Sequence, residues 1–320
     1  MAKVLVINQD LFQQLVTFEE TIAIVEQAFT RFYQQRSIVF PAVRHPIEEH
    51  NGIFSIKSSY LIDDSSVGLK TGGFWKNNSK IGKTNHQSTM LLLNPETGEP
   101  VCLMDANYLT GIRTGAAGAV AAKYLARQNS RTVSLIGAGV QARTQLEGLT
   151  HLFSIEKVTV VSHTEESSRK LAEEIRQKGI AAEHSVSPRQ AVEQSDIVIT
   201  TTPSFSPVIK TSWLTDGTHI NAIGSDTKGK REIEMDRMPD KVVCDYWEQS
   251  SSLGELQNQV TRKVLYGELG EITSGEKPGR QSASEMTLFD STGISVQDLS
   301  VAAFAYRKAM DLKKGVYVEL

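Results

Sequence analysis

Residues 132–142 read TVSLIGAGVQA, an apolar run that leads into a glycine-rich turn. The pattern Gly137-x-Gly139-x-x-Ala142 follows a predicted strand and opens a predicted helix, as a dinucleotide-binding turn requires. The first glycine makes the tight turn, the second lets a pyrophosphate approach the backbone, and the third position needs a small residue for packing. The helix N-terminus offers free N–H groups to the phosphates. A purely structural turn is the alternative, which the flanking strand and helix disfavour.

The segments that follow this turn alternate between strands and helices. Predicted strands lie at 157–161, near 180–184, and at 196–202, 218–224 and 241–245, and predicted helices lie at 165–178, near 188–195 and near 247–258. Such alternation is typical of a parallel sheet that helices cover on both faces. The predicted fold class is therefore α/β, with a doubly wound parallel sheet.

The two ends of the chain are predicted to form a second domain. Helices are predicted at 18–36, 107–127 and 296–313, with short strands between 38 and 104. The first helix begins with a capping box of Thr17 and Glu20. We expect the last helix to return to the N-terminal part, which makes this domain discontinuous. The predicted domains are 1–125 with 294–320, and 126–293 for the dinucleotide-binding domain.

Composition excludes several classes of protein. The 34 Lys+Arg residues nearly balance the 37 Asp+Glu residues, for a net charge of −3. No basic tract indicates nucleic-acid binding, and no apolar run approaches the ~18 residues that span a bilayer. The N-terminal segment MAKVLVINQDLF lacks the apolar core of a signal peptide. Cys102 and Cys244 are too few for a disulfide framework or a zinc site, so we expect a cytoplasmic protein with reduced thiols and no metal.

The residues after the second strand of the dinucleotide-binding domain bear on the choice of cofactor. NAD sites place an acid there, about 20 residues beyond the glycine turn, to bind the ribose 2′-OH. This chain has Ser162, His163 and Thr164 at that place, and Glu165 and Glu166 come later. A 2′-phosphate is then not repelled, and the three side chains can donate to it. The sequence favours NADP over NAD; the alternative is a permissive loop that accepts both.

The N-terminal half carries four scattered cations: Arg44, Lys57, Lys70 and Arg113. Each taken alone can be a solvated surface residue, because charged side chains are mostly exposed. Lys70, however, lies among apolar residues and glycines in VGLKTGGFW, and Arg113 lies in a helix with almost no other charge. A buried cation needs an anionic partner, and a substrate carboxylate suits the guanidinium fork of arginine. A lysine in such a pocket can act as an acid or base near neutral pH.

A set of longer motifs makes the chain recognisable. They are FPAVRH (40–45), GLKTGG (68–73), the block 85–127, LIGAGVQA (135–142), HINAIGSDTKGKREI (219–233), ELGEITSGEKPGR (268–280) and FDSTGISVQDLSVA (289–302). With these motifs the chain resembles the ornithine cyclodeaminase/mu-crystallin family over essentially its whole length. The resemblance implies a Rossmann domain joined to an α/β domain that binds substrate and pairs two subunits into a homodimer. It also implies chemistry on an imine conjugated to a carboxylate, with hydride exchange at a bound nicotinamide.

The resemblance also implies roles for individual residues. Arg44, Lys70 and Arg113 would hold the substrate carboxylate, and Lys70 would assist proton transfer at the substrate nitrogen. Asp226 would lie over the reacting centre, although an aspartate in such a loop can also be a turn cap. We assign Gly293 to the substrate site. The cofactor site is assigned Arg113, Thr114, Gly137, Ala138, Gly139, Val140, Gln141, Ala142, Ser162, His163, Thr164, Thr201, Thr202, Ser225 and Asp226.

Two positions separate this chain from true ornithine cyclodeaminases. Those enzymes carry a glutamate where this chain has Ser55, and a cation, Lys57, follows two residues later. A site that lacks the acid and gains a cation suits a second substrate carboxylate better than a substrate ammonium. His86 could contact that carboxylate, or it could be a structural hydrogen-bond donor. The motifs are similar to the iminosuccinate reductase branch, so we expect reduction of a small α-imino acid. The alternatives are alanine dehydrogenase-like activity, ornithine cyclodeamination, and a non-catalytic NADPH-binding protein like mu-crystallin.

Overall fold

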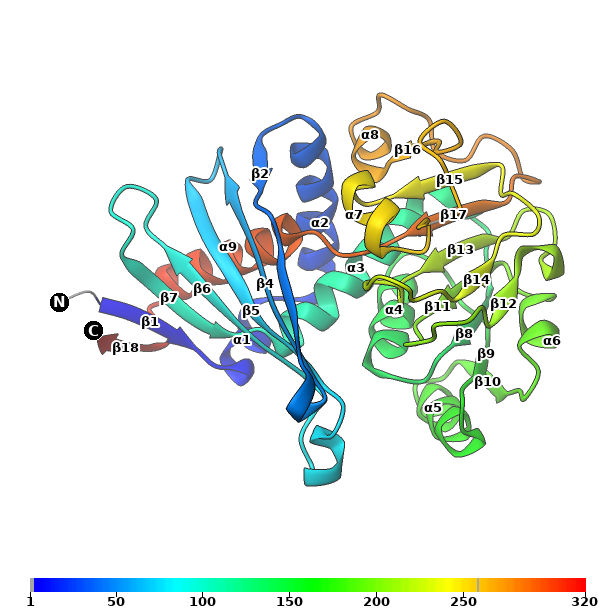
Figure 1. The fold of residues 1–320 in the computed structure, drawn as a ribbon, viewed down its shortest axis with the longest axis horizontal. Coiled ribbons are helices and arrows are strands. Elements are labelled where there is room, and N and C mark those ends of the chain that lie inside the picture. Colours follow the sequence, from blue (N-terminus) through cyan, green and yellow to red (C-terminus); the bar gives the residue numbers. More distant parts are fainter. Residues whose placement is uncertain (1–2, 258) are drawn as a thin grey trace. The chain divides into compact units, whose positions relative to one another are not determined.

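The computed structural model describes residues 3–257 and 259–320. They form two compact units (Figure 1). The first comprises the N-terminal segment up to Arg113 together with Ile294–Leu320, and the second comprises Thr114–Gly293. The sequence places the first boundary after residue 125, at the end of the helix α3 (Asn107–Leu125), whereas the units divide within that helix. The reason is that the carbonyls of Thr114 and Gly118 accept hydrogen bonds from Gln145 and Asn221 of the second unit.

The first unit is built on one sheet with the strand order β18-β1-β7-β6-β5-β4-β2, and β3 pairs with β4 off this path. Its strands are β1 (Lys3–Ile7), β2 (Ser37–Val39), β3 (Val43–Ile47), β4 (Gly52–Leu61), β5 (Ser66–Trp75), β6 (His86–Leu93), β7 (Pro100–Asp105) and β18 (Val316–Glu319). Its helices are α1 (Gln9–Leu15), α2 (Phe18–Tyr33) and α9 (Ser295–Asp311), with 3₁₀ turns at Glu48–His50 and Asn78–Ile81. The pairing of β1 with β7 is parallel and the other pairings are antiparallel.

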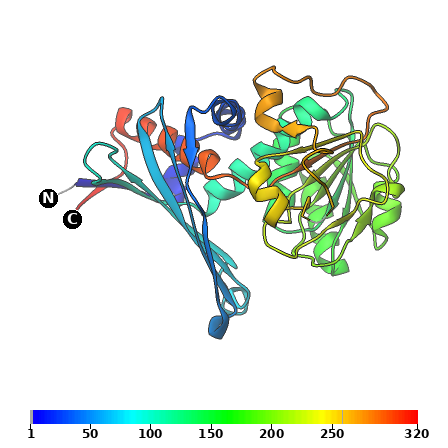
Figure 2. The ribbon, with the colours of Figure 1, turned by 45° about the horizontal axis from the view of Figure 1, so that its top comes forward.

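Helices cover one face of this sheet. Helix α9 lies against β4 and β5 and packs on α2, as Figures 1 and 2 show. The face beneath is apolar and buried, with Leu5, Met90, Leu92, Cys102 and Met104 almost without exposure. The predicted capping box of α2 is confirmed, since Thr17 accepts from the backbone of Glu20 and Glu20 accepts from that of Thr17.

The other face of this sheet has no covering layer among the described residues. Strand register places Val6, Leu103, Leu91 and Leu69 in one row across β1, β7, β6 and β5. Leu103 is 40% exposed and the other three are partly exposed. This row is an apolar strip on an open sheet face.

The second unit contains a parallel sheet with the strand order β10-β9-β8-β11-β13-β17-β15-β16. Its strands are β8 (Thr132–Ile136), β9 (Lys157–Val161), β10 (Ala181–His184), β11 (Ile197–Thr200), β13 (His219–Ala222), β15 (Lys241–Cys244), β16 (Gly267–Glu268) and β17 (Thr287–Asp290), with a separate pair β12 (Ile209–Lys210) and β14 (Ile233–Glu234). Its helices are α4 (Val140–Thr150), α5 (Glu165–Gln177), α6 (Pro188–Val192), α7 (Trp247–Leu253) and α8 (Leu269–Thr273), with a 3₁₀ turn at Thr211–Trp213. The predicted doubly wound parallel sheet is confirmed.

The strand order also locates the ligand crevice of this sheet. The chain runs outward from β8 through β9 to β10, then returns to place β11 on the other side of β8. Ligands of such sheets bind outside the carboxyl ends of the strands at this reversal. The helix predicted near 247–258 is shorter than expected and ends at Leu253, while Asn258 lies outside the described residues. Within the described residues, no helix is long and apolar enough to cross a membrane.

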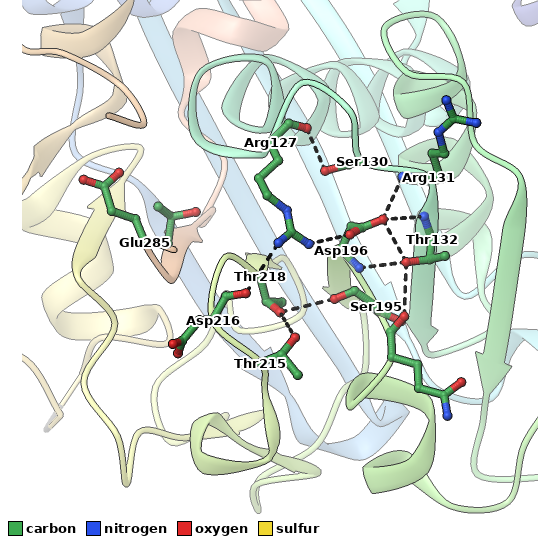
Figure 3. Close-up of polar contacts among 12 residues, drawn as sticks. Arg127, Ser130, Arg131, Thr132, Ser195, Asp196, Thr215, Asp216, Thr218 and Glu285 are labelled. Carbon is green, nitrogen blue, oxygen red and sulfur yellow. Dashed lines mark hydrogen bonds and ion pairs between the residues drawn. The ribbon is translucent and has the colours of Figure 1, made fainter. Parts of the chain in front are cut away.

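At the amino ends of these strands, Asp196 links β8 to β11. Asp196 immediately precedes β11 (Figure 3). Its Oδ2 accepts from the backbone N–H groups of Arg131 and Thr132 at 2.8 and 2.9 Å and from the Thr132 hydroxyl at 2.9 Å. Its Oδ1 accepts from the Arg127 guanidinium at 2.5 Å. Burial alone would raise the pKa of Asp196, but the hydrogen bonds from Arg131, Thr132 and Arg127 outweigh it and lower that pKa. The carboxylate thus fixes β8 beside β11.

We predict that Asp196→Ala lowers the free energy of unfolding by roughly 2–3 kcal/mol, because two backbone N–H groups and a guanidinium lose their acceptor. Glu156→Ala is the control, since Glu156 pairs with Arg131 at the surface, where such a pair is worth about 0–1 kcal/mol. Urea denaturation of both variants measures the difference. Because the pKa of Asp196 is lowered, the difference should shrink as the pH falls through its folded-state pKa. Equal effects of the two variants would contradict this role.

Candidate functional site

The predicted cations of the first unit share the helix-covered face of its sheet. The predicted cations on its strands are Arg44, Lys57 and Lys70, and His86, a predicted substrate contact, lies on the same face. Lys57 on β4 lies directly opposite Lys70 on β5. On the other side of β5, Met90 of β6 lies opposite Lys70, and His86 is four residues before Met90 on the same strand. Arg44 lies opposite Ser55, two residues before Lys57. Since alternate residues of a strand share a face, the register brings all four side chains to one side of the sheet.

Lys70 is buried on this face and is held by two acceptors. Its Nζ donates to Oδ1 of Asp298, on α9, at 2.7 Å and to the hydroxyl of Thr110, on α3, at 3.2 Å. Lys70 is 8% exposed and Asp298 is 1% exposed. The prediction that Lys70 is not a surface lysine is therefore confirmed by its burial.

Arg113 shares the same acid. Its Nε donates to Oδ1 of Asp298 at 2.9 Å, and its Nη1 donates to the side-chain oxygen of Gln297 at 3.0 Å. Two cations thus meet on one carboxylate oxygen, so the cluster of Lys70, Arg113 and Asp298 carries an excess positive charge when Lys70 is protonated. The sequence analysis assigned the compensating anion to the substrate, and the structure shows that the chain itself supplies one.

The electrostatics of this cluster make Lys70 titratable near neutral pH. Burial, together with repulsion from Arg113 and Lys57, lowers the pKa of Lys70 to about 7, although Asp298 acts in the opposite direction. Burial opposes ionisation of Asp298, but Arg113 and Lys70 outweigh it and lower the pKa of that carboxyl. The chemical result is an ion cluster in which the lysine can lose and regain a proton at physiological pH.

In the second unit, the glycine-rich turn lies at the reversal of strand order. The N–H of Gly137 donates to the carbonyl of Val161 at 2.8 Å, and its φ is +121°. A Cβ at Gly137 would lie 2.4 Å from the hydroxyl oxygen of Thr201, so only glycine lets the turn approach the end of β11. Gly139 is the N-cap of α4, and a Cβ built there meets no atom within 4 Å. Ala142 is fully buried. This open approach to a helix N-terminus fits the pyrophosphate of a dinucleotide.

The remaining residues of the turn flank this approach. Ala138 is partly buried, and Val140 and Gln141 are in the first turn of α4. Arg143 was not predicted to belong to the turn; its Nη1 donates to the carbonyls of Ala138 and Gly139 at 2.7 and 3.0 Å. Thr201, after β11, is held by its N–H to the carbonyl of Ile136 at 2.8 Å.

The predicted ribose end of the site follows β9. Ser162 is partly buried, whereas His163 and Thr164 are exposed, and Thr164 caps α5. Glu165 is engaged by Arg169, with Nε 2.9 Å from the carboxylate, and this hydrogen bond lowers the pKa of Glu165. The first acid after the strand is therefore paired within its own helix.

Asp226 lies in the loop after β13. Its Oδ1 accepts from Lys230 at 2.7 Å and from the hydroxyl of Thr227 at 3.0 Å, so the carboxylate is held by its own loop. Ser225 donates to Glu255 at 2.5 Å. Asp226 belongs to the second unit and Lys70 to the first, so the expected meeting of these two side chains stays a prediction.

Two further predicted residues belong to the second unit. Gly293 has a φ of +74° and donates its N–H to Asp245 at 2.6 Å. Thr114 has its carbonyl bound by Gln145 at 2.7 Å. Both positions are fixed by the second unit, and their assigned contacts with ligands stay predictions.

The most important residue that sequence reasoning missed is Asp298. The signal was present, because Asp298 is the single acid of the apolar stretch 294–303, just as Arg113 is the single charge near the start of its helix. A single acid in one apolar helix and a single cation in another predict an ion pair between the two helices, here between Asp298 and Arg113.

Comparison with known proteins agrees with these features. The model of the ornithine cyclodeaminase/mu-crystallin family matches residues 3–313. An archaeal alanine dehydrogenase dimer with bound NAD has a TM-score of 0.94 at 35% identity, with both chains covered fully. The Δ¹-pyrroline-2-carboxylate reductase of Thermococcus litoralis, in complex with NADH and L-proline, has a TM-score of 0.94 at 35% identity and covers 98% of this chain and all of its own. The iminosuccinate reductase of Paracoccus denitrificans, in complex with NAD⁺, has a TM-score of 0.91 at 32% identity, again with full coverage.

These relatives are oxidoreductases that use a nicotinamide dinucleotide, and the glycine turn of this chain has the geometry that such a cofactor needs. Full-length coverage at this identity excludes a match that is confined to the nucleotide-binding domain. The chain is therefore an oxidoreductase of the ornithine cyclodeaminase/mu-crystallin family.

Proposed function

We propose that the protein reduces a small α-imino acid, iminosuccinate to aspartate first among the candidates, with NADPH or NADH. The observation that carries this proposal is the cluster of Lys70, Arg113 and Asp298, in which two buried cations share one acid. A substrate carboxylate would complete the charge balance. The name of the Paracoccus relative supports iminosuccinate as the substrate class.

Substrate orientation is the first task of this site. Arg113 and Arg44 bind the carboxylate next to the imine, and Lys57 binds the second carboxylate of iminosuccinate. Lys57 lies opposite Lys70 in the strand register, so both carboxylates meet fixed cations on one sheet face. Because these charges are already in place, little reorganisation is needed when the imine reacts.

Proton transfer is the second task. The bound dinucleotide supplies a hydride to the imine carbon. Lys70 donates a proton to the imine nitrogen, so that the C=N bond becomes a CH–NH bond, and the neutral lysine regains its proton from water. A pKa of about 7 suits this cycle near neutral pH. Contact between Asp226 and this nitrogen stays a prediction from the family resemblance.

Three other activities remain as alternatives. The Thermococcus relative, with L-proline bound, supports reduction of a cyclic imine, and the archaeal relative supports alanine dehydrogenation. Ornithine cyclodeamination is disfavoured because Ser55 replaces the glutamate that would bind a diamine. A non-catalytic NADPH-binding role would leave the titratable Lys70 without a function.

We also propose that two copies of the chain form a homodimer through the open face of the first sheet. The apolar strip of Val6, Leu69, Leu91 and Leu103 supports this face, because exposed apolar patches mark interaction sites. The archaeal relative is a dimer. The predicted cytoplasmic location and the absence of nucleic-acid and membrane partners stay predictions.

The substrate prediction is tested with iminosuccinate, formed from oxaloacetate and ammonia, by following the absorbance of the reduced nicotinamide. We expect kcat/KM about tenfold higher than for Δ¹-pyrroline-2-carboxylate or the imine of pyruvate, because a second ion pair is worth on the order of 1.4 kcal/mol. Lys57→Met should remove this advantage, so that the ratio of kcat/KM for iminosuccinate to kcat/KM for the monocarboxylates falls to about one. The proposal would be overturned if the protein reduced no iminosuccinate and instead converted ornithine to proline without a net change in the cofactor.

The lysine prediction concerns the pH dependence of reduction. Lys70 must be protonated to act as the acid, so kcat/KM should fall as the pH rises above about 7. Asp298→Asn removes the anion that favours the ammonium and should move this fall to lower pH by about one unit. Lys57→Met removes a repelling cation and should move it to higher pH. Lys70→Met should abolish turnover and keep cofactor binding; unmoved pH profiles would contradict the assignment.

The cofactor prediction concerns the end of β9. We expect a lower Michaelis constant for NADPH than for NADH, since Ser162, His163 and Thr164 place no carboxylate there. Ser162→Asp should weaken NADPH roughly tenfold or more relative to NADH, because the new carboxylate repels a 2′-phosphate and can bind a 2′-OH. Glu166→Gln, in the exposed first turn of α5, is the control and should change neither constant. A clear preference of the unmodified protein for NADH would show that the prediction is wrong.

A further inference from the structure

Two buried glutamates lie beneath the segments that carry Thr201, Thr202 and Asp226. Glu232 and Glu255 are both fully buried. Neither forms an ion pair with a lysine or arginine within 3–257 and 259–320. Burying two carboxylates without a cation is costly, so their hydrogen-bond partners need an explanation.

Glu232 connects the ends of two neighbouring parallel strands, β11 and β13. Its Oε1 accepts from the backbone N–H and the hydroxyl of Thr202, at 2.5 and 2.8 Å. Its Oε2 accepts from the hydroxyl of Thr200 and from the backbone N–H of Gly224, both at 2.8 Å. One side chain therefore holds the segment after β11 against the segment after β13, at the edge where this sheet binds ligands.

The contact between Gly224 and Glu232 requires a residue without a side chain. A Cβ there would lie 2.2 Å from the carbonyl oxygen of Thr202 and 2.6 Å from Oε2 of Glu232. Only glycine lets the two segments come this close. Two residues later the chain reaches Asp226, so the position of the glycine sets where the loop of that acid begins.

Glu255 holds Glu232 in turn. Its carboxylate accepts from the backbone N–H groups of Glu232 and Ile233, at 2.9 and 2.8 Å, and from the hydroxyl of Ser225 at 2.5 Å. The residue that directly precedes Asp226 is thus tied to the same pair of acids. The two carboxylates form one network under both segments.

We infer that Glu232, supported by Glu255, is a positioning residue for hydride transfer. It fixes the segment of Thr201 and Thr202 and the loop of Asp226 relative to each other, so that these two segments, both assigned to the cofactor, keep one geometry around the nicotinamide. This inference rests on the proposed function. It assigns no contact between Glu232 and a ligand, because its oxygens are taken by four donors of the chain.

The chemistry of an amide makes the test sharp. Each oxygen of Glu232 accepts from one backbone N–H, and a backbone N–H cannot reverse its role. In Glu232→Gln one oxygen becomes an NH₂ group, which must face one of these two donors whichever way the amide turns. In Glu255→Gln the NH₂ group can take the place of Oε2 and face Ser225, whose hydroxyl can turn and accept. The backbone N–H of Glu232, which reaches Oε2 at 2.9 Å, also reaches Oε1 at 3.2 Å, so Oε1 can keep it together with the N–H of Ile233. Each variant replaces one carboxyl oxygen with an NH₂ group, but only Glu232→Gln must leave a backbone N–H without its acceptor.

The experiment measures kcat with NADH and with NADH deuterated at both C4 positions, and the dissociation constant of NADH from its fluorescence. For Glu232→Gln we expect kcat to fall about tenfold or more, the deuterium isotope effect on kcat to rise, and NADH to bind about fivefold more weakly. Glu255→Gln should change kcat less than about threefold. Glu234→Gln is the matched control, since Glu234 is 40% exposed and pairs with Lys210 on the next strand; all of its constants should stay unchanged.

A merely structural role gives a different pattern. Glu232→Gln would then lose activity in proportion to its folded fraction, with an unchanged isotope effect and unchanged NADH affinity, and the inference would be wrong. Gly224→Ala, which alters no charge, serves if Glu232→Gln does not fold, and it should reproduce the rise in the isotope effect. If the unmodified protein binds NADH but reduces no imine, the proposed function fails, and the NADH affinity of the variants alone decides this inference.

Discussion

One carboxylate oxygen of Asp298 accepts hydrogen bonds from both Lys70 and Arg113, and the chemistry proposed for the first unit depends on it. Without this acid, the two buried cations, Lys70 on β5 and Arg113 on α3, would repel each other, and either Lys70 would lose its proton or the side chains would lose their burial. With a full second acid, the cluster would be neutral and would have no preference for an anionic substrate. One acid for two cations lets the protein bury both and still attract a carboxylate. The lysine is also left with a pKa of about 7.

The fold was largely predictable because its signals are local. The glycine turn and the capping box of Thr17 each occupy a few neighbouring residues, and each strand or helix of the alternating pattern is recognised from its own short segment. The structure confirms them. The cluster around Asp298 was not predictable in the same way, since Asp298 is 228 positions from Lys70 and 185 from Arg113 in the sequence. The division of the two units within α3 has a related cause, because side chains of the second unit bind carbonyls of that helix. The roles of Arg44 and His86 stay predictions, since the sheet register shows only that they share a face.

In the second unit, buried or partly buried carboxylates accept hydrogen bonds from backbone N–H groups at both ends of the parallel strands. Asp196 does this at the amino end of β11 and Glu232 at the carboxyl end. A carboxylate suits this task because it accepts at both oxygens and from several directions. The two sites differ in what lies beside them. Asp196 has an arginine partner and partial exposure, as a stabilising contact should. Glu232 is fully buried and forms no ion pair with the residues that the structure describes, at the strand ends where we propose that the dinucleotide binds.

The pairing of β1 with β18 brings the two ends of the described chain together, with Lys3 opposite Glu319 (Figure 2). A short peptide could therefore join these ends, and the chain could be opened elsewhere as a circular permutant. Opening it between Gly293 and Ile294 would give an order in which Ile294–Leu320 precedes the N-terminal segment and the second unit follows without interruption. The first unit would then be one continuous stretch of sequence, so that each unit could be encoded, labelled with isotopes and joined by ligation as a separate segment.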